Sequence, residues 1–240
     1  IEFDQGDLIY LPVHSMNLLS AYIGMDEIKL DSIRKSKWNQ KKQKTFEKAY
    51  DFAAELIESE AKRSNYKRSP LEINKEGFQK FIENFPYELT PDQLKCSHSL
   101  INDFNSPKMM DRLICGEVGF GKTEMALRAS YISYMNGFQV CLMVPTTILA
   151  EQHYETFTKR FSGYDVDVVL LTRNLSTQEK KDVYLKILNQ PNLIVIGTHA
   201  LMNNKLDFNN VGLLIIDEEH KFGVKQKEKI KSLKAQIDVM

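Results

Sequence analysis

The sequence lacks any long apolar run, and this absence excludes the simplest membrane and secretion signals. It contains no stretch of about 18 apolar residues, the length a membrane-spanning helix requires, and no basic segment followed by an apolar one precedes the rest. We therefore expect a cytoplasmic protein that has no membrane partner.

A surplus of charge is also missing, and cysteine is scarce. Lys and Arg total 32, as do Asp and Glu, so any attraction to nucleic acid must come from a local patch or from backbone amides. The three cysteines, Cys96, Cys115 and Cys141, are odd in number and lack the spacing of metal ligands. Two of them lie in apolar runs, where free thiols pack as small hydrophobic groups, so we expect buried thiols and no zinc site.

The front of the chain changes pattern twice. "IEFDQGDLIYLPV" alternates like a strand until Pro12, so we expect residues 1–25 to be the remnant of a β-rich domain and the chain to be a fragment. Residues 26–65 follow as a linker and a long helix, because apolar residues recur at helical spacing from Lys37 to about Arg63 without Gly or Pro. This helix is either a connector with a solvated basic face or a docking element that transmits its position to another domain.

From residue 66 onward, short apolar runs alternate with amphipathic stretches. The runs are "RLICG", "QVCLMVP", "DVDVVLLT", "NLIVIGT" and "VGLLIID". Strands that are continuously apolar are buried on both faces, which requires a parallel sheet covered by helices. We therefore expect residues 66–240 to form a doubly wound α/β lobe.

The stretch "GEVGFGKTE" predicts a phosphate-binding loop. Gly116, Gly121, Lys122 and Thr123 match G-x-x-x-x-G-K-[ST] between an expected strand and an expected helix, a placement that disfavours an ordinary turn. The loop amides would surround phosphates at the helix N-terminus, Lys122 would reach the β- and γ-phosphates of ATP, and the Thr123 hydroxyl would bind Mg²⁺. The residues expected to contact the nucleotide here are Gly116, Glu117, Val118, Gly119, Phe120, Gly121, Lys122, Thr123 and Glu124.

A second acidic element completes the expected ATPase site. "LLIIDEEH" ends an apolar strand on Asp217 and Glu218, at the carboxyl edge of the sheet, where such folds bind ligands. Asp217 fits the carboxylate that holds Mg²⁺ directly or through water, and Glu218 fits the group that orients the attacking water. With Lys122 they form the predicted catalytic set. The alternative is a charged strand end that caps a helix.

Longer stretches resemble a known family. "GEVGFGKTEMALRA", "VPTTILAEQHYETF", "IGTHAL" and "LLIIDEEHKFGVKQKEKIK" resemble, in order and spacing, the first motor lobe of superfamily 2 translocases, most closely the bacterial transcription-repair coupling factors. "LIYLPVHSMNLLSAYIG" resembles the end of that family's RNA polymerase-interacting domain, and "WNQKKQKTFEKAYDFAAELIESEAKR" resembles its long relay helix. The resemblance implies a RecA-like ATP-binding lobe over residues 66–240.

The resemblance also implies roles for further residues. Gln93 of "FPYELTPDQ" would pair with the adenine edge, while either Phe85 or Tyr87 would stack on the ring. Two loops would touch the DNA backbone and one residue would couple the nucleotide site to DNA; these are Pro145, Thr146, Thr147, Gly197, Thr198, His199 and, for coupling, His220. Both histidines could instead be ordinary packed side chains.

The family implies an activity for the parent protein and a limit for this chain. It implies an ATP-dependent double-stranded DNA translocase that displaces stalled RNA polymerase and couples transcription to nucleotide excision repair. Excision-repair proteins would bind through regions outside these 240 residues, and the arginines that complete the ATP site would lie in a second motor lobe. We therefore expect binding of ATP and Mg²⁺ without hydrolysis. The alternatives are a lobe of a RecG-like fork-remodelling helicase and a non-hydrolysing relay or interaction module.

The sequence departs from the family pattern at two positions near the site. Glu117 stands where relatives usually carry Asp, and Lys221 stands where they carry Arg. Both substitutions keep the charge, so ATP binding is still expected. A lysine at position 221 nevertheless lacks the planar fork with which arginine makes paired hydrogen bonds.

Overall fold

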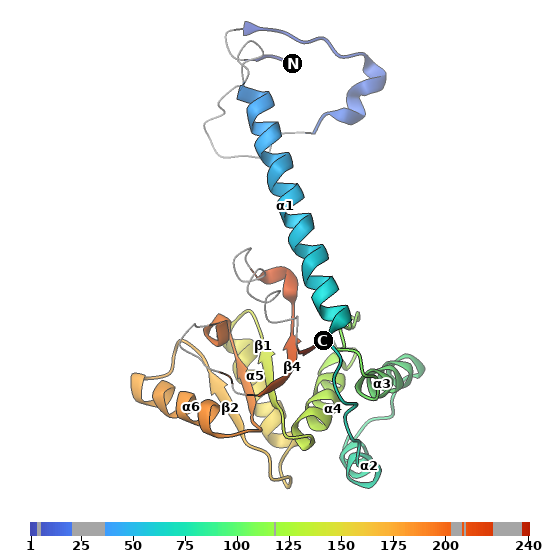
Figure 1. Ribbon diagram of the computed structural model, residues 1–240, viewed down its shortest axis with the longest axis vertical. Coiled ribbons are helices and arrows are strands. Elements are labelled where there is room, and N and C mark those ends of the chain that lie inside the picture. The colour runs from blue at the N-terminus through green and yellow to red at the C-terminus, as the bar shows by residue number, and fades with distance from the viewer. Residues whose placement is uncertain (4–5, 21–36, 118, 203–207, 209, 223–236) are drawn as a thin grey trace. The chain divides into compact units, whose positions relative to one another are not determined.

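The computed structural model describes residues 1–3, 6–20, 37–117, 119–202, 208, 210–222 and 237–240. The chain divides into two compact units, Ile1–Glu58 and Ser59–Met240. Each unit is described by itself, and Figure 1 shows the elements of both.

Among its described residues, the first unit contains little regular structure apart from one long helix. An isolated antiparallel bridge joins Glu2 to Leu8, and a 3-10 helix, η2, spans Val13–Leu18 directly after Pro12. The strand expected in this region is thus reduced to a single bridge. The expected long helix is confirmed as α1, Lys37–Asn65, whose last residues belong to the second unit. Its apolar side chains Phe46 and Tyr50 are exposed, so the described part of residues 1–25 does not cover them.

The second unit is built on a parallel sheet, as the continuous apolar runs predict. Its strands are β1 Gln139–Met143, β2 Val168–Leu171, β3 Ile194–Gly197, β4 Val211–Ile216 and β5 Asp238–Val239. Their order in the sheet is β2-β3-β1-β4-β5, and every neighbouring pair is parallel. The doubly wound α/β fold is therefore confirmed.

Helices cover both faces of this sheet. They are α2 Lys75–Glu83, α3 Pro91–Phe104, α4 Lys122–Met135, α5 Thr147–Arg160 and α6 Thr177–Asn189, with 3-10 turns η3 His199–Met202 and η4 Glu219–Lys221. Val140 and Leu142 of β1 face the core formed with α2 to α5, whereas Cys141 and Met143 face the core that includes Ile187 of α6. Within the described ranges, no helix has both the length and the apolar character needed to cross a bilayer.

Two expectations near the start of the lobe need correction. The strand expected at "RLICG" is absent, because only Asp111 pairs with the sheet, through an isolated parallel bridge to Val239 of the short edge strand β5. Cys115, which follows in the same stretch, is exposed. Cys141 is buried as expected, and burial raises the pKa of its thiol to about 12.

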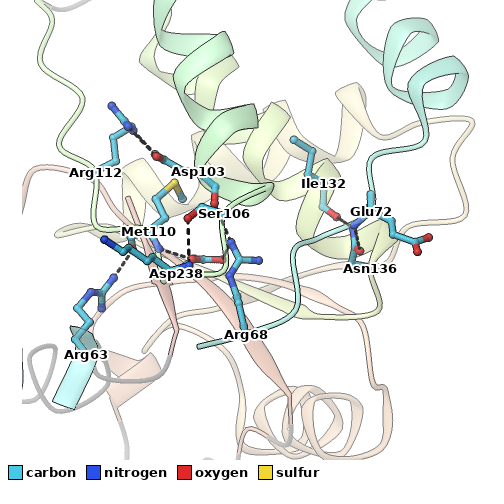
Figure 2. Close-up of polar contacts among 11 residues, drawn as sticks. Arg63, Arg68, Glu72, Asp103, Ser106, Met110, Arg112, Ile132, Asn136 and Asp238 are labelled. Carbon is cyan, nitrogen blue, oxygen red and sulfur yellow. Dashed lines mark hydrogen bonds and ion pairs between the residues drawn. The ribbon is translucent and has the colours of Figure 1, made fainter. Parts of the chain in front are cut away.

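A buried polar network ties the start of the lobe to β5, as Figure 2 shows. The Met110 amide donates to Asp238 Oδ1 at 2.6 Å, and Arg68 Nη2 lies 3.2 Å from Asp238 Oδ2. Arg63, in the last turns of α1, donates to the carbonyl of Met110. Because Met110 precedes the glycine loop by only a few residues, this network fixes the segment that enters the loop.

Candidate functional site

The glycine loop closes around its own lysine. Gly119 and Gly121 have φ angles of 87° and 73°, a region that favours glycine, and α4 begins at the next residue, Lys122. The Lys122 ammonium donates to the carbonyls of Gly116 and Glu117 at 2.6 and 2.8 Å. The loop therefore has the shape expected of a phosphate-binding loop. The ammonium group of Lys122 is the hydrogen-bond donor to two of the loop's own backbone carbonyls. Val118 lies outside the described residues.

Gln93 connects the aromatic segment to this loop. Its Oε1 accepts from the Thr90 amide at 2.8 Å within the capping box of α3, and its Nε2 donates to the Phe120 carbonyl at 2.9 Å. A Cβ at Gly121 would lie 2.6 Å from Gln93 Nε2, so only glycine leaves room for the contact. Sequence spacing places Gln93 far from the loop, but the fold brings the two together.

A cavity of about 900 Å³ adjoins both parts. Phe85, Tyr87 and Gln93 line one part of it, and Gly121 and Thr123 line another. The Phe85 and Tyr87 rings meet edge to face with centroids 5.4 Å apart. The cavity thus offers aromatic surface and a phosphate-binding loop within one space, as an adenine nucleotide requires.

A second cavity, of about 960 Å³, borders Cys141, Met143 and Leu214. None of the predicted site residues lines it. The predicted nucleotide-contacting residues Phe85, Gln93, Gly119, Gly121, Thr123 and Glu124 line the cavity beside the glycine loop, whereas Lys122, Asp217 and Glu218 line neither cavity.

The carboxyl ends of three neighbouring strands bring the other predicted residues together. Met143 at the end of β1 pairs with Gly197 on one side and with Ile216 on the other. The Asp217 amide then donates to the Met143 carbonyl at 2.9 Å. As a result, the loops after β1, β3 and β4 start from the same edge of the sheet.

Asp217 is held as a carboxylate. The His153 ring donates through Nε2 to Asp217 Oδ2 at 3.1 Å, and this hydrogen bond is the main reason that the pKa of Asp217 is lowered. The positive charge of Lys122 lowers the pKa further. An ionised carboxylate is an oxygen ligand of the kind that a bound Mg²⁺ would need.

Glu218 has an unusual backbone. Its φ of 54° is the one positive φ of a non-glycine residue among those described, and such strain is common at functional sites. Its carboxylate pairs with the Lys221 ammonium. The strained turn points to a local constraint, and the ion pair with Lys221 is a contact that the sequence does not predict.

The donor set fits Mg²⁺ better than zinc. Thr123 and Asp217 supply oxygen ligands, which Mg²⁺ prefers, and phosphate oxygens and water complete such sites. In the part of the chain that the structure describes, no group of three or more His, Cys, Asp or Glu side chains could hold a metal ion. Thr123 and Asp217 are the residues of this chain that would hold Mg²⁺.

The predicted DNA-contacting loops differ in exposure. Thr146 is exposed and caps α5, accepting from the Leu149 amide at 3.2 Å. Thr198 is only 2% exposed, so in this conformation its side chain cannot reach a DNA backbone, whereas His199 is exposed. Pro145 and Thr147 are partly buried, Gly197 lies at the end of β3, and the side chain of His220 lies outside the described residues.

Sequence reasoning missed the residues of α5 and α4 that support the site. His153 orients Asp217, and the buried Glu124 accepts from Arg128 Nε at 2.8 Å and lies 3.4 Å from Arg160 Nη2. Glu124 was expected only as a nucleotide contact. One sequence signal points to His153 and Arg160. They recur at helical spacing on the face of α5 that also carries the buried Phe157.

Comparisons with known proteins show the family to which the chain belongs. The profile of the family described as DEAD/DEAH box helicase matches residues 90–240. A transcription-repair-coupling factor of Haemophilus influenzae is 46% identical over 234 residues, which cover 97% of this chain and 20% of that protein. The Escherichia coli protein of the same name is 40% identical over 234 residues, which again cover 97% of this chain and 20% of that protein. This chain therefore spans about a fifth of the length of these curated relatives. The structure of RecG bound to a three-way DNA junction matches with a TM-score of 0.65 and 36% identity, covering 75% of this chain and 24% of that chain.

Proposed function

Because the chain belongs to the DEAD/DEAH box helicase family, we propose that residues 66–240 are the ATP-binding first lobe of a double-stranded DNA translocase. The observation that carries the proposal is the cavity that borders both the glycine loop and the segment of Phe85 and Gln93. One nucleotide can extend from the aromatic residues to the loop without leaving this space. The residue spacing of the glycine loop and its position in the fold both support an orientation in which the phosphates of the ligand lie at this loop.

Each residue of the site has a defined task in this proposal. Lys122 exchanges its two backbone carbonyls for the β- and γ-phosphates, since a phosphate is the stronger partner for an ammonium group. Thr123 and Asp217 hold Mg²⁺, which would neutralise charge on the phosphates. Glu218 orients the attacking water. Gln93, already bonded to the loop carbonyl of Phe120, pairs with the adenine edge and so links base recognition to loop geometry.

For the longer protein to which this chain would belong, we propose the function that its relatives' name describes. It would translocate on double-stranded DNA, displace stalled RNA polymerase and couple transcription to nucleotide excision repair. Residues 1–25 would be the end of a polymerase-interacting domain and residues 26–65 would contain the relay helix. Binding of excision-repair proteins would use regions that this chain, about a fifth of those relatives, does not include.

A lobe of a RecG-like fork-remodelling helicase is the second candidate. The match to RecG favours it, because the two structures share the lobe at 36% identity. That match covers 75% of this chain, whereas the transcription-repair-coupling factors match 97% of it. The coupling-factor assignment therefore accounts for more of the sequence.

Nucleotide binding tests the proposal directly. Isothermal titration of the 240-residue chain with Mg-ATP should show binding that Lys122→Ala weakens by about 10- to 100-fold, the loss expected when charged hydrogen bonds worth about 1.5–3 kcal/mol are removed. Lys95→Ala is a suitable control, because Lys95 pairs with Asp92 on the surface of α3. Unchanged ATP affinity in a folded Lys122→Ala variant would refute the assignment.

A further inference from the structure

Arg160, the last residue of α5, connects two other helices. Its Nη2 donates to the Phe81 carbonyl of α2 at 2.6 Å and lies 3.4 Å from Oε1 of Glu124, in the first turn of α4. The guanidinium carbon also lies 4.2 Å from the centroid of the Phe81 ring, a distance typical of a cation packed on an aromatic ring. One side chain therefore links the end of α2 to the start of α4.

This link is buried. Phe81 is completely buried, and the side chains of Glu124 and Arg160 are 3% and 11% exposed. Nε and Nη1 of Arg160 are buried as well and have no hydrogen-bond partner among the residues that the structure describes. These atoms cannot reach a ligand, so Arg160 acts on a ligand only through the groups that it holds.

On the α2 side, the link holds the segment that carries the aromatic rings of the cavity. Phe81 lies in the last turn of α2, and the Phe85 amide donates to the Ile82 carbonyl at 2.9 Å directly after the helix. Phe85 and Tyr87 then line the cavity. The position of Phe81 thus sets the point from which segment 85–87 enters the cavity.

On the α4 side, the link ends next to the glycine loop. The Glu124 amide donates to the Gly121 carbonyl at 3.0 Å, and its carboxylate accepts from Arg128 Nε at 2.8 Å. Charged hydrogen bonds of this kind are among the stronger ones in proteins. Arg160 is therefore tied to a carboxylate whose own position is fixed relative to the loop.

We propose that Arg160 and Glu124 are positioning residues, which set the separation between segment 85–87 and the glycine loop. The inference rests on the proposed function, because it concerns the same nucleotide site. A ligand that binds both parts at once gains affinity when their separation is fixed before binding, since less ordering accompanies the binding step. A ligand that binds the loop alone gains nothing from this link.

Two ligands and two backgrounds test the proposal by titration calorimetry. Arg160→Met should lower the affinity for Mg-ATP by about tenfold, within the range lost when a base no longer stacks on an aromatic ring, and should leave the affinity for Mg-tripolyphosphate unchanged. In a chain that already carries Phe85→Ala and Tyr87→Ala, the same substitution should not change the Mg-ATP affinity further. The reason is that a positioning residue acts only through the rings that it positions.

Arg128→Met is the matched control. Arg128 donates to the same Glu124 carboxylate, but its second contact is Ser97 of α3 instead of Phe81. Each methionine variant leaves Glu124 with one arginine, so urea unfolding should show a loss of stability in both. The Mg-ATP affinity should fall in Arg160→Met alone.

Arg160→Lys provides a conservative variant. It keeps a charged donor beside Glu124, so it should bind Mg-ATP more tightly than Arg160→Met does, with the same dependence on the rings of Phe85 and Tyr87. It also replaces Arg160→Met in every comparison if the methionine variant does not fold.

The contrary outcomes are distinct. Equal losses of Mg-ATP affinity with and without the two aromatic rings, equal losses in Arg160→Met and Arg128→Met, or no loss in Arg160→Met would each overturn the inference and leave the proposed function intact. A folded wild-type chain that binds neither Mg-ATP nor Mg-tripolyphosphate would overturn both.

Discussion

Gly121 combines a positive φ with a close neighbour from the aromatic segment. Its φ of 73° costs a side chain about 1–2 kcal/mol, and a Cβ there would lie 2.6 Å from Gln93 Nε2. We predict that Gly121→Ala displaces Gln93 from the Phe120 carbonyl, and so lowers both the free energy of unfolding and the affinity for Mg-ATP. Urea unfolding and ATP titration of the variant measure the two effects.

Gly163 provides the matched control for this substitution. Its φ of 90° disfavours a side chain as the φ of Gly121 does, but no atom lies within 4 Å of a Cβ built there. Gly163→Ala should therefore show the backbone cost alone, with normal ATP affinity. Equal unfolding losses in the two variants would contradict the close contact between Gly121 and Gln93.

At the scale of elements, Asp238 joins β5 to the segment that enters the glycine loop. Burial raises the pKa of Asp238 to about 6 even though the Met110 amide, Arg68 and Arg63 act to lower it, and nearby Asp103 adds to the increase. A carboxyl whose folded pKa is raised contributes stability that is complete below its unfolded value of 3.8 and is lost as the pH rises through about 6. At about 1.36 kcal/mol per pKa unit, the change is on the order of 3 kcal/mol.

Replacement of Asp238 by Asn should remove this pH dependence. We predict that the unfolding free energy of the wild type, measured relative to Asp238→Asn in urea, falls as the pH rises from 3.8 to about 6. Arg68→Met should move this fall to higher pH, because the Arg68 charge lowers the pKa of Asp238. A constant difference between wild type and Asp238→Asn across that range would show that Asp238 does not titrate there.

Elements differ in how well the sequence predicts them. Continuous apolar runs predict β1 to β4, because strands buried on both faces tolerate no polar alternation. The run "RLICG" misleads, since its neighbour β5 is only two residues long and provides one bridge. Within the site, spacing identifies the glycine loop and Asp217, but it cannot identify His153 or Arg160. Their partners lie 64 and 79 residues away along the chain, and only tertiary packing brings them together.

At the scale of the whole chain, binding and turnover of ATP make different demands. In the proposed site, the ground-state contacts would come from the loop, Lys122, Thr123 and Asp217. Hydrolysis also needs positive charge on the γ-phosphate in the transition state, and an arginine finger there is worth about 10³- to 10⁵-fold in rate. The family resemblance implies that this finger lies in a second lobe. We therefore expect the 240-residue chain to bind Mg-ATP and to turn it over negligibly.

The most direct test is steady-state ATP hydrolysis by the purified 240-residue chain, with and without duplex DNA, on protein whose Mg-ATP binding has been measured by titration. Glu218→Gln serves as the control, because it removes the group proposed to orient water. The account predicts clear binding, with turnover no higher than that of Glu218→Gln whether or not DNA is present. DNA-stimulated turnover that Glu218→Gln abolishes would contradict it, and would show that this single lobe completes the catalytic site.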